Sequence, residues 1–222
     1  MKVLCDFDGT VAKNDVGYLL FRKFADNGVE DVINLWKTGQ ISSKECLMEE
    51  CRIARVTRQE LEAFTDAQPL DAHFKSFVQF CRTQKIAIEI VSDGLDFYVE
   101  RILKNHHLYS GFEVHANHLK FVDQNQIEPE FPYFEAGCGH CANCKGLHVR
   151  NAREQHDTVI YVGDGLSDRC GAEEADIVFA KTNRDLLRHC QQNQIPHHPF
   201  EHFGQVRVQL EKILKHDVLI KK

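Results

Sequence analysis

The hydrophobic and polar positions of this chain follow two periods, one typical of buried strands and one typical of amphipathic helices. Short apolar runs have the length of buried strands and lie at 2–7, 86–92, 158–164 and 176–181. Between them, apolar residues recur at helical spacing in segments that include 74–81, 96–107, 145–155 and 184–190. Strands separated by helices predict an α/β fold, a parallel sheet flanked by helices and joined by right-handed crossovers.

One long segment, residues 14–68, interrupts this alternation directly after the first strand. Its apolar residues recur at helical spacing and Gly28 and Gly39 punctuate it, so we expect several short helices there and no strand. We therefore predict a small helical cap domain over 14–68, inserted into a catalytic core made of 1–13 and 69–222.

Two later segments have patterns of their own. Residues 112–134 combine β-type alternation with the turn residues Asp-Gln-Asn-Gln, which predicts a hairpin. Residues 195–203 are rich in histidine, and we expect a solvated turn there that is packed by Phe200 and Phe203.

Polar residues gather where three of the predicted strands end. The first strand runs into Asp-Phe-Asp-Gly-Thr (6–10), the second into Ser-Asp-Gly (92–94) and the third into Gly-Asp-Gly-Leu-Ser-Asp (163–168). In an open α/β sheet, ligands bind outside these carboxyl ends. Carboxylates held close together repel one another, and a divalent cation with oxygen ligands, such as Mg²⁺, would offset that cost.

Any one of these aspartates could be a turn former or a helix cap. Their occurrence on successive strands, together with Ser92 and with Lys145 at the start of a helix, is hard to explain by capping. We interpret the set as one site that binds an ion and a phosphate group.

These residues carry a resemblance to a known family. The segments DFDGT (6–10) and GDGLSD (163–168), with Ser92 and Lys145 between them, resemble the four ordered motifs of haloacid dehalogenase (HAD) superfamily phosphatases. The resemblance implies a HAD-like Rossmannoid sheet with a small cap, and hydrolysis of a phosphomonoester through an aspartyl-phosphate intermediate.

The resemblance also assigns roles to the residues. It implies that Asp6 is the nucleophile and that Asp8 is the general acid and base. It places Mg²⁺ between Asp6, the Asp8 carbonyl and Asp164, with Asp168 behind them or against Lys145. It implies that Ser92 and Lys145 bind the phosphoryl oxygens, together with the backbone amides after Asp8 and Ser92. The amides after Ser92 belong to Asp93 and Gly94.

The substrate is a small phosphorylated metabolite whose identity stays open. A helical cap in this position resembles the phosphoserine phosphatase subfamily, in which an acidic residue reads the substrate amine. Asp15 is at the corresponding place, one methylene shorter than the usual glutamate, and it could equally be a helix N-cap. The segments 91–103 and 195–203 and the cysteines before Lys145 resemble the phosphatases of methionine salvage, and relatives acting on phosphoethanolamine or phosphocholine share some of these features.

A cysteine-rich loop precedes Lys145. Cys138, Cys141 and Cys144 lie within seven residues, and this spacing suits a structural zinc ion that needs four ligands. The fourth ligand could be His140, His148 or a hairpin residue such as His115 or His118. The other interpretation is a tight loop of reduced thiols that positions Lys145 without a metal, and the sequence does not decide between the two.

Composition narrows the remaining classes of function. The net charge of −6 argues against nucleic-acid binding, which shows as a basic face. The chain has no apolar run of the ~20 residues that a membrane span needs. Nine cysteines and an N-terminus unlike a signal peptide predict a reducing compartment, so we expect a cytoplasmic protein. The oligomeric state stays open.

Two other functions compete with hydrolysis. A mutase or phosphotransferase would use the same nucleophile and acid but return the phosphate to an acceptor. A non-catalytic module would only bind zinc or another ion, and would have no need of Asp8 and Lys145 in register.

Overall fold

The computed structural model describes residues 1–25 and 28–220, and a seven-stranded sheet forms their centre. The spatial order is β4-β3-β2-β1-β5-β6-β7. The strands are β1 (Lys2–Cys5), β2 (Ala87–Leu95), β3 (Glu113–Phe121), β4 (Ile127–Glu130), β5 (Val159–Gly163), β6 (Ile177–Lys181) and β7 (His198–Phe200). All neighbouring pairs are parallel except β3–β4, which is the hairpin expected at 112–134. The predicted α/β fold with a parallel sheet is therefore confirmed.

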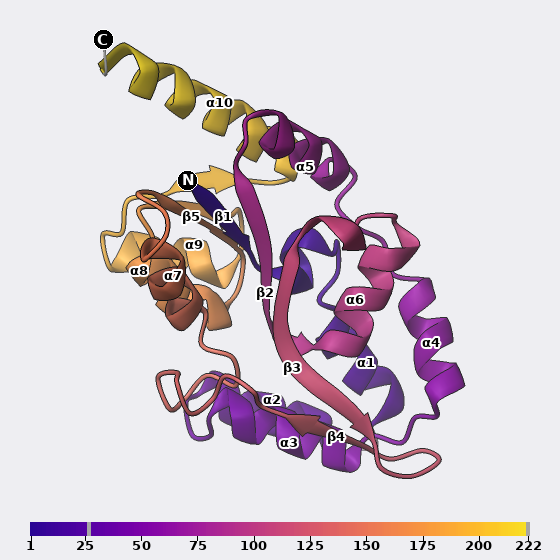
Figure 1. Ribbon diagram of the computed structural model, residues 1–222. Coiled ribbons are helices and arrows are strands. Elements are labelled where there is room, and N and C mark those ends of the chain that lie inside the picture. Colours follow the sequence, from indigo (N-terminus) through magenta and orange to yellow (C-terminus); the bar gives the residue numbers. More distant parts are fainter. Residues whose placement is uncertain (26–27, 221–222) are drawn as a thin grey trace.

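Helices cover both faces of this sheet because side chains alternate along its buried strands (Figure 1). Val3 and Cys5 of β1 join an apolar core with α5 (Phe74–Thr83), α6 (Asp96–Asn105) and α10 (Phe203–Ile220). Leu4 points to the other face, where it packs with α7 (Lys145–Arg153). Helices α8 (Arg169–Glu174) and α9 (Asp185–Gln192) extend this second layer over β6.

The segment after β1 is helical, as its periodicity predicts. Its helices are α1 (Val16–Phe24), α2 (Val29–Lys37), α3 (Ser43–Ile53) and α4 (Arg58–Asp66). Ser42 begins α3 and Thr57 begins α4, each through a reciprocal capping box with the glutamate three residues on. Of the helices formed by residues 1–25 and 28–220, none combines the length and the apolar character that a membrane crossing requires.

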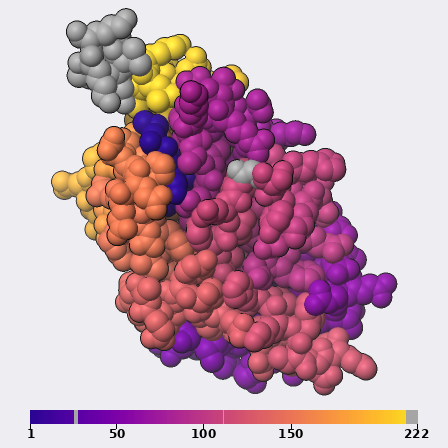
Figure 2. Space-filling model, viewed as in Figure 1, coloured from indigo at the N-terminus to yellow at the C-terminus, as the bar shows by residue number. Residues whose placement is uncertain are grey.

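These helices form two groups in space (Figure 1). Helices α1 and α4 lie beside α6, whereas α2 and α3 lie across the end of the sheet against β4. Two hydrogen bonds fasten the second group to the hairpin. The Val56 amide donates to the Asn125 carbonyl at 2.9 Å, and the Gln126 side chain donates to the Cys51 carbonyl at 2.9 Å. In Figure 2, the hairpin and the loop after it, coloured pink to salmon, cover the lower part of the face in view.

Three expectations from the sequence need correction. The first strand ends at Cys5, because the chain turns sharply over Phe7–Val11. The second strand continues to Leu95, which pairs with Asn117. Residues 92–94 therefore lie inside β2, at the irregularity in its pairing with β3, and not after the strand. Residues 198–200 form β7 and not a solvated turn. A segment of three residues is too short to show the alternation of polar and apolar residues that marks a strand. It is a strand because it pairs with β6.

A stability prediction follows from the start of α10. The Phe203 ring is fully buried and lies 4.8 Å from the Phe74 ring and 5.1 Å from the Phe77 ring, measured between centroids. We expect Phe203→Ala to lower the free energy of unfolding by about 3–5 kcal/mol, because the cavity forms where α10, α5 and β7 meet. Urea denaturation measures it. The control Val208→Ala, on the exposed side of the same helix, should change stability by less than about 0.5 kcal/mol, and similar losses in the two variants would contradict this packing.

Candidate active site

The carboxyl ends of β1 and β5 bring the first and last of the predicted motifs together. Asp6 follows β1, and Asp164 follows β5, its direct neighbour in the sheet. Gly9 makes the close approach between them feasible. Its φ is +73°, and a Cβ there would lie 2.5 Å from Asp164 Oδ2. The Thr10 hydroxyl, also in this turn, donates to Asp164 Oδ1 at 3.3 Å.

Lys145 connects this pair of strand ends to α7. Its side chain is only 1% exposed, and its ammonium lies 2.5 Å from Asp6 Oδ1 and 2.5 Å from Asp168 Oδ1. A third hydrogen bond, 3.0 Å long, goes to the Ser167 hydroxyl. The structure thus brings Asp6 together with Lys145 and Asp168, which both lie more than a hundred residues after it in the sequence.

Asp168 is fully buried and holds the surrounding chain in place. Besides the Lys145 ammonium, its carboxylate accepts the Tyr161 hydroxyl at 2.6 Å and the backbone amides of Asp164 and Gly165 at 2.7 Å each. A carboxylate with this many donors is fixed in place. Asp168 therefore orients Lys145 and the turn that carries Asp164.

Negative charge exceeds positive charge at this point. Carboxylate oxygens of Asp6, Asp164 and Asp168 lie within 4.8 Å of one another. Burial and the nearby Asp168 raise the pKa of Asp6, and the same two causes raise the pKa of Asp164 to about 7. Burial alone would lower the pKa of Lys145, but the Asp168 and Asp6 carboxylates raise it above its ordinary value. The Lys145 ammonium and the half-exposed Arg184 guanidinium, whose Nε lies 3.5 Å from Asp164 Oδ2, do not balance three carboxylates. The donor set therefore fits a hard divalent cation such as Mg²⁺.

Asp8 lies beside this group but turns toward α1. Its Oδ1 accepts the backbone amides of Val16 at 2.8 Å and Gly17 at 3.2 Å, at the start of α1. Its Oδ2 accepts the Tyr98 hydroxyl at 2.7 Å and the Ser92 hydroxyl at 3.3 Å. Burial, followed by the nearby Asp15 carboxyl, raises the pKa of Asp8 to about 7. A carboxyl group with this pKa can both hold and release a proton near neutral pH.

The end of β2 contributes Ser92, Asp93 and Gly94. The Ser92 hydroxyl is buried, faces Asp8 and accepts the Gly94 amide at 3.0 Å. Asp93 Oδ1 accepts the amide of Asn143 at 2.6 Å, and burial raises the pKa of Asp93. The Asn143 side chain donates in turn to the Ser92 carbonyl at 2.9 Å and the His115 carbonyl at 3.0 Å. The loop before Lys145 is therefore joined to the end of β2.

The sequence offered Asp15 two roles, a helix N-cap and a contact for the substrate, and its place in the structure is compatible with both. It is the N-cap of α1, where its Oδ1 accepts the Tyr18 amide at 2.9 Å. It also lines the cavity in front of Asp6 and Asp8. Asp15 as a whole residue is exposed to solvent, and the enclosure of its carboxyl among the cavity walls raises its pKa. A capping role therefore does not keep the Asp15 carboxyl away from a ligand.

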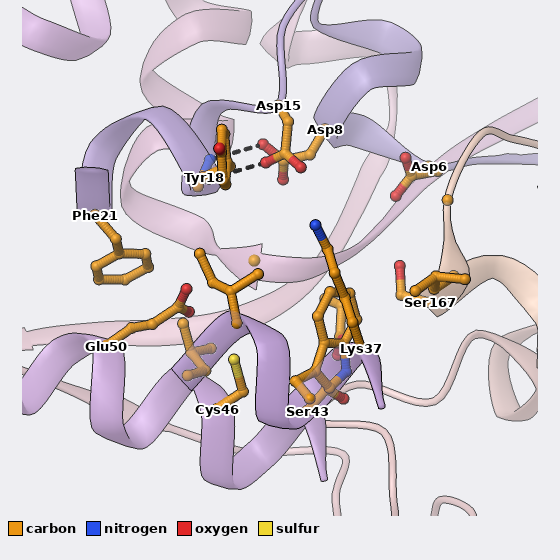
Figure 3. Close-up of a pocket in the computed structure, with 18 of the residues that line it drawn as sticks. Asp6, Asp8, Asp15, Tyr18, Phe21, Lys37, Ser43, Cys46, Glu50 and Ser167 are labelled. Carbon is orange, nitrogen blue, oxygen red and sulfur yellow. Dashed lines mark hydrogen bonds between the residues drawn. The ribbon is translucent and has the colours of Figure 1, made fainter. Parts of the chain in front are cut away.

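The cavity measures about 340 Å³ and lies between the strand ends and helices α1, α2 and α3. Figure 3 shows Ser43, Cys46 and Glu50 projecting from α3 toward the wall that carries Asp6, Asp8 and Asp15. Glu50 is 9% exposed, and burial, then the Asp15 carboxyl, raise its pKa to about 8. Apolar side chains line the same part of the cavity, namely Phe21, Ile33, Trp36 and Leu47.

The three thiols of the cysteine-rich loop lie together, and a fourth thiol from outside the loop joins them. Cys138, Cys141 and Cys144 lie with Cys170, and their sulfur atoms are all within 4.8 Å of one another. Among the described residues, the group of potential metal ligands around these thiols contains Cys170 and none of the candidate histidines, His140, His148, His115 or His118. The His148 ring is buried, and its Nε2 lies 2.6 Å from Asn143 Oδ1. This nitrogen is therefore hydrogen-bonded to Asn143 and is not directed at the thiols.

The hairpin histidines are also engaged away from the thiols. His115 lies 3.3 Å from the Tyr133 hydroxyl and 3.3 Å from Glu89 Oε2. His118 lies 2.8 Å from Asp96 Oδ2.

Sequence reasoning missed several residues of this site. Tyr98 stands on α6 at a position that reads as ordinary helix core. Asn143 was passed over as a loop residue between two cysteines, and Glu50 as part of an amphipathic helix. Cys170 lies outside the cysteine-rich loop, but its position two residues after Asp168 ties it to the last motif. Only this last signal could have been found without the fold.

Comparisons with known proteins agree with this arrangement. The family model described as "Putative Phosphatase" matches residues 1–206. A 2-hydroxy-3-keto-5-methylthiopentenyl-1-phosphate phosphatase from Bacillus cereus (strain 03BB102) is 28% identical over 219 residues, which cover 97% of this chain and 98% of that protein.

Solved structures share the fold at lower identity. A phospho-aspartyl intermediate analogue of a phosphoserine phosphatase has a TM-score of 0.70 and 18% identity, with 96% of this chain and 97% of that chain covered. A phosphoserine phosphohydrolase-like protein from Francisella tularensis subsp. tularensis SCHU S4 has a TM-score of 0.71 and 21% identity, with 94% and 99% covered. From the matched family, the curated relative and the shared fold, we conclude that the chain belongs to the family described as "Putative Phosphatase" and is a phosphoric monoester hydrolase with the fold of the phosphoserine phosphatases.

Proposed function

We propose that this enzyme hydrolyses a small phosphomonoester through an aspartyl-phosphate on Asp6, with Mg²⁺ as cofactor. The observation that carries the proposal is the buried Lys145 ammonium, 2.5 Å from both Asp6 and Asp168, next to Asp164. Asp6 faces the cavity, whereas Asp168 is held behind it by backbone and tyrosine donors. This difference supports Asp6 as the nucleophile and Asp168 as the residue that positions Lys145.

The reaction has two displacements at phosphorus. In the first, an Asp6 oxygen attacks the phosphorus, the bond to the substrate oxygen breaks, and Asp8 gives its proton to that leaving oxygen. In the second, Asp8 takes a proton from water, the water oxygen attacks the phosphorus, and the bond to Asp6 breaks. Inorganic phosphate leaves, and both carboxyl groups return to their starting states. The pKa of Asp8 near 7 supports both proton transfers at neutral pH.

The other residues bind and orient the phosphoryl group. Magnesium held by Asp6, Asp164 and the Asp8 carbonyl would supply positive charge to the phosphoryl oxygens. Lys145 and Ser92, with the amides of Asp93 and Gly94, would hold the same oxygens. Tyr98 and the first amides of α1 would hold the Asp8 carboxyl in position.

We propose that residues 14–68 act as the cap that covers this cavity. Helices α1, α2 and α3 supply its outer walls, and the core of 1–13 and 69–222 supplies the motif residues. Closure would exclude water from the acyl phosphate until the leaving group has departed. We also propose that the enzyme works in the cytoplasm, because a reducing compartment keeps cysteines as free thiols.

Substitution of Asp6 tests the mechanism. We expect Asp6→Asn to lower Mg²⁺-dependent phosphate release from an aryl phosphate by roughly a thousandfold or more, because the amide is not nucleophilic. Colorimetric phosphate release, with and without a chelator, measures it. Asp157→Asn, at an exposed aspartate, serves as the control and should retain full activity. Full turnover by the Asp6 variant, or activity that survives complete removal of divalent cations, would contradict the mechanism.

The apolar wall of the cavity supports a substrate with an apolar end. The relative from Bacillus cereus is named for a 2-hydroxy-3-keto-5-methylthiopentenyl phosphate. Its methylthio group would be covered by Phe21, Ile33, Trp36 and Leu47, whereas phosphoserine has no apolar part to place there. We therefore propose the methionine-salvage phosphate as the substrate.

Trp36 gives a test of this substrate. We expect Trp36→Ala to lower kcat/KM for the methylthio substrate by on the order of tenfold, because apolar contact with its tail is lost. With phosphoserine as substrate, the same variant should change kcat/KM little. The neighbouring Leu35→Ala, at an exposed position outside the cavity, is the matched control. Equal losses of kcat/KM with both substrates would count against an apolar tail in this part of the cavity.

A second candidate is an amino-alcohol phosphate such as phosphoethanolamine or phosphocholine. It is favoured by the facing carboxyls of Asp15 and Glu50, which could receive a cationic group. Here Glu50→Gln should lower kcat/KM for these substrates by at least about tenfold, because a buried charge partner is removed. Glu49→Gln, at the preceding, partly exposed residue of α3, is the control. Kinetics on both substrate classes decide between the candidates, since the Glu50 variant should hardly affect an uncharged methylthio substrate.

A further inference from the structure

The cysteine cluster has the dimensions of a mononuclear tetrathiolate site. The sulfur atoms of Cys138, Cys141, Cys144 and Cys170 all lie within 4.8 Å of one another, and those of Cys141 and Cys170 are 3.9 Å apart. A tetrahedral zinc ion with Zn–S bonds of about 2.3 Å requires sulfur atoms roughly 3.8 Å apart. The thiols converge at this spacing from two segments that are remote in the sequence.

The local backbone supports thiolate ligands at the first two cysteines. Gly139 has a φ of +76°, which lets the chain turn sharply between Cys138 and Cys141. The turn directs the Cys141 backbone amide to the Cys138 sulfur at 3.3 Å. An amide hydrogen bond to sulfur stabilises the negative charge that a zinc-bound thiolate carries.

Two glycines let the remaining cysteines approach. Cys144 is the N-cap of α7, where the positive end of the helix favours a thiolate. A Cβ on Gly146 would lie 2.8 Å from the Cys170 carbonyl oxygen, so only glycine lets α7 pack this closely against α8. A Cβ on Gly137 would lie 2.9 Å from Cys144 Cβ, so the loop also returns closely onto its own end.

Other fates of these thiols fit the arrangement less well. A disulfide would join two sulfurs at about 2.05 Å and leave the other two without a partner, whereas the arrangement holds all four together. Hydrogen bonds between thiols are weak and give little reason for four sulfurs, three of them on buried or half-buried cysteines, to converge. An iron–sulfur cluster needs room between the thiolates for several irons and sulfides, and a spacing within 4.8 Å leaves none.

We propose that Cys138, Cys141, Cys144 and Cys170 bind one zinc ion, which fastens the loop before α7 to the start of α8. Cys144 immediately precedes Lys145, and Cys170 follows Asp168 by two residues. The ion therefore clips together the two segments whose side chains form the buried pair at the site. The same loop carries the His140 carbonyl, which accepts the Ser43 amide of α3 at 3.2 Å.

Metal analysis of the purified protein tests the site without reference to catalysis. We expect about one zinc ion per chain in protein purified under reducing conditions, and loss of that zinc to background in Cys170→Ala. Cys190→Ala, at a buried cysteine outside the cluster, is the matched control and should keep the metal. Cys138→Ser, at the exposed member of the cluster, provides a second variant if Cys170→Ala folds poorly.

Spectroscopy identifies the ligands. Replacement of zinc by Co²⁺ should give the intense thiolate charge-transfer and tetrahedral ligand-field bands of a tetrathiolate site, and these bands should weaken and shift in Cys138→Ser. Thermal unfolding should occur at a lower temperature in zinc-depleted protein than in the holo form, and zinc addition should restore it. In Cys190→Ala the same zinc-dependent shift should remain.

Three results would overturn the proposal. One is protein that neither contains zinc nor takes up added zinc or Co²⁺ at these thiols. Another is zinc retained in full by both cluster variants. The third is a disulfide among these cysteines in protein purified under reducing conditions, detected as protected thiols by alkylation and mass spectrometry.

Discussion

A single buried ammonium group organises the catalytic end of this molecule. Lys145 is almost fully enclosed, and a charge in that position is tolerated only because Asp6 and Asp168 lie within hydrogen-bond distance. Removing one partner from such a group typically costs about 3–5 kcal/mol. The strand ends, α7 and the turn after β5 must therefore all be in place for any one of them to be stable.

The two carboxylates that contact Lys145, those of Asp6 and Asp168, differ in their other partners. Asp168 accepts backbone amides and a tyrosine hydroxyl, so its oxygens are occupied by protein. Asp6 has one oxygen on Lys145 and still faces the cavity. The buried Asn143 side chain adds a second tie between the same loop and the end of β2. Rigid surroundings of this kind hold the Asp6 carboxylate in one orientation at the edge of the cavity, as the proposed attack on phosphorus requires.

The sequence predicts the sheet and the gathering of its motifs because these depend on local patterns. Buried parallel strands appear as apolar runs, and polar residues at their ends meet at one edge whatever the details of packing. Short pieces such as β7 escape detection, since pairing with β6 creates them. The same holds for Tyr98 and Glu50, whose importance comes from what faces them across the cavity and not from their own surroundings in sequence. Cys170 is not among the ligands that the sequence suggests for the cysteine-rich loop, because the other three cysteines lie 26 or more residues earlier.

The β3–β4 hairpin has a mechanical consequence. At its start β3 pairs with β2 in the central sheet, and near its end it pairs with β4, on which α3 rests. One continuous strand thus connects α3, which lines one side of the cavity, to the central sheet, whose strand ends line the other side. A flexible linker in the place of β3 would not fix the distance between these two sides. The only break in the β2–β3 ladder lies between Val91 and Leu95, beside Ser92. A displacement of α3 against β4 would therefore be transmitted along β3 to this irregularity, next to the end of β2.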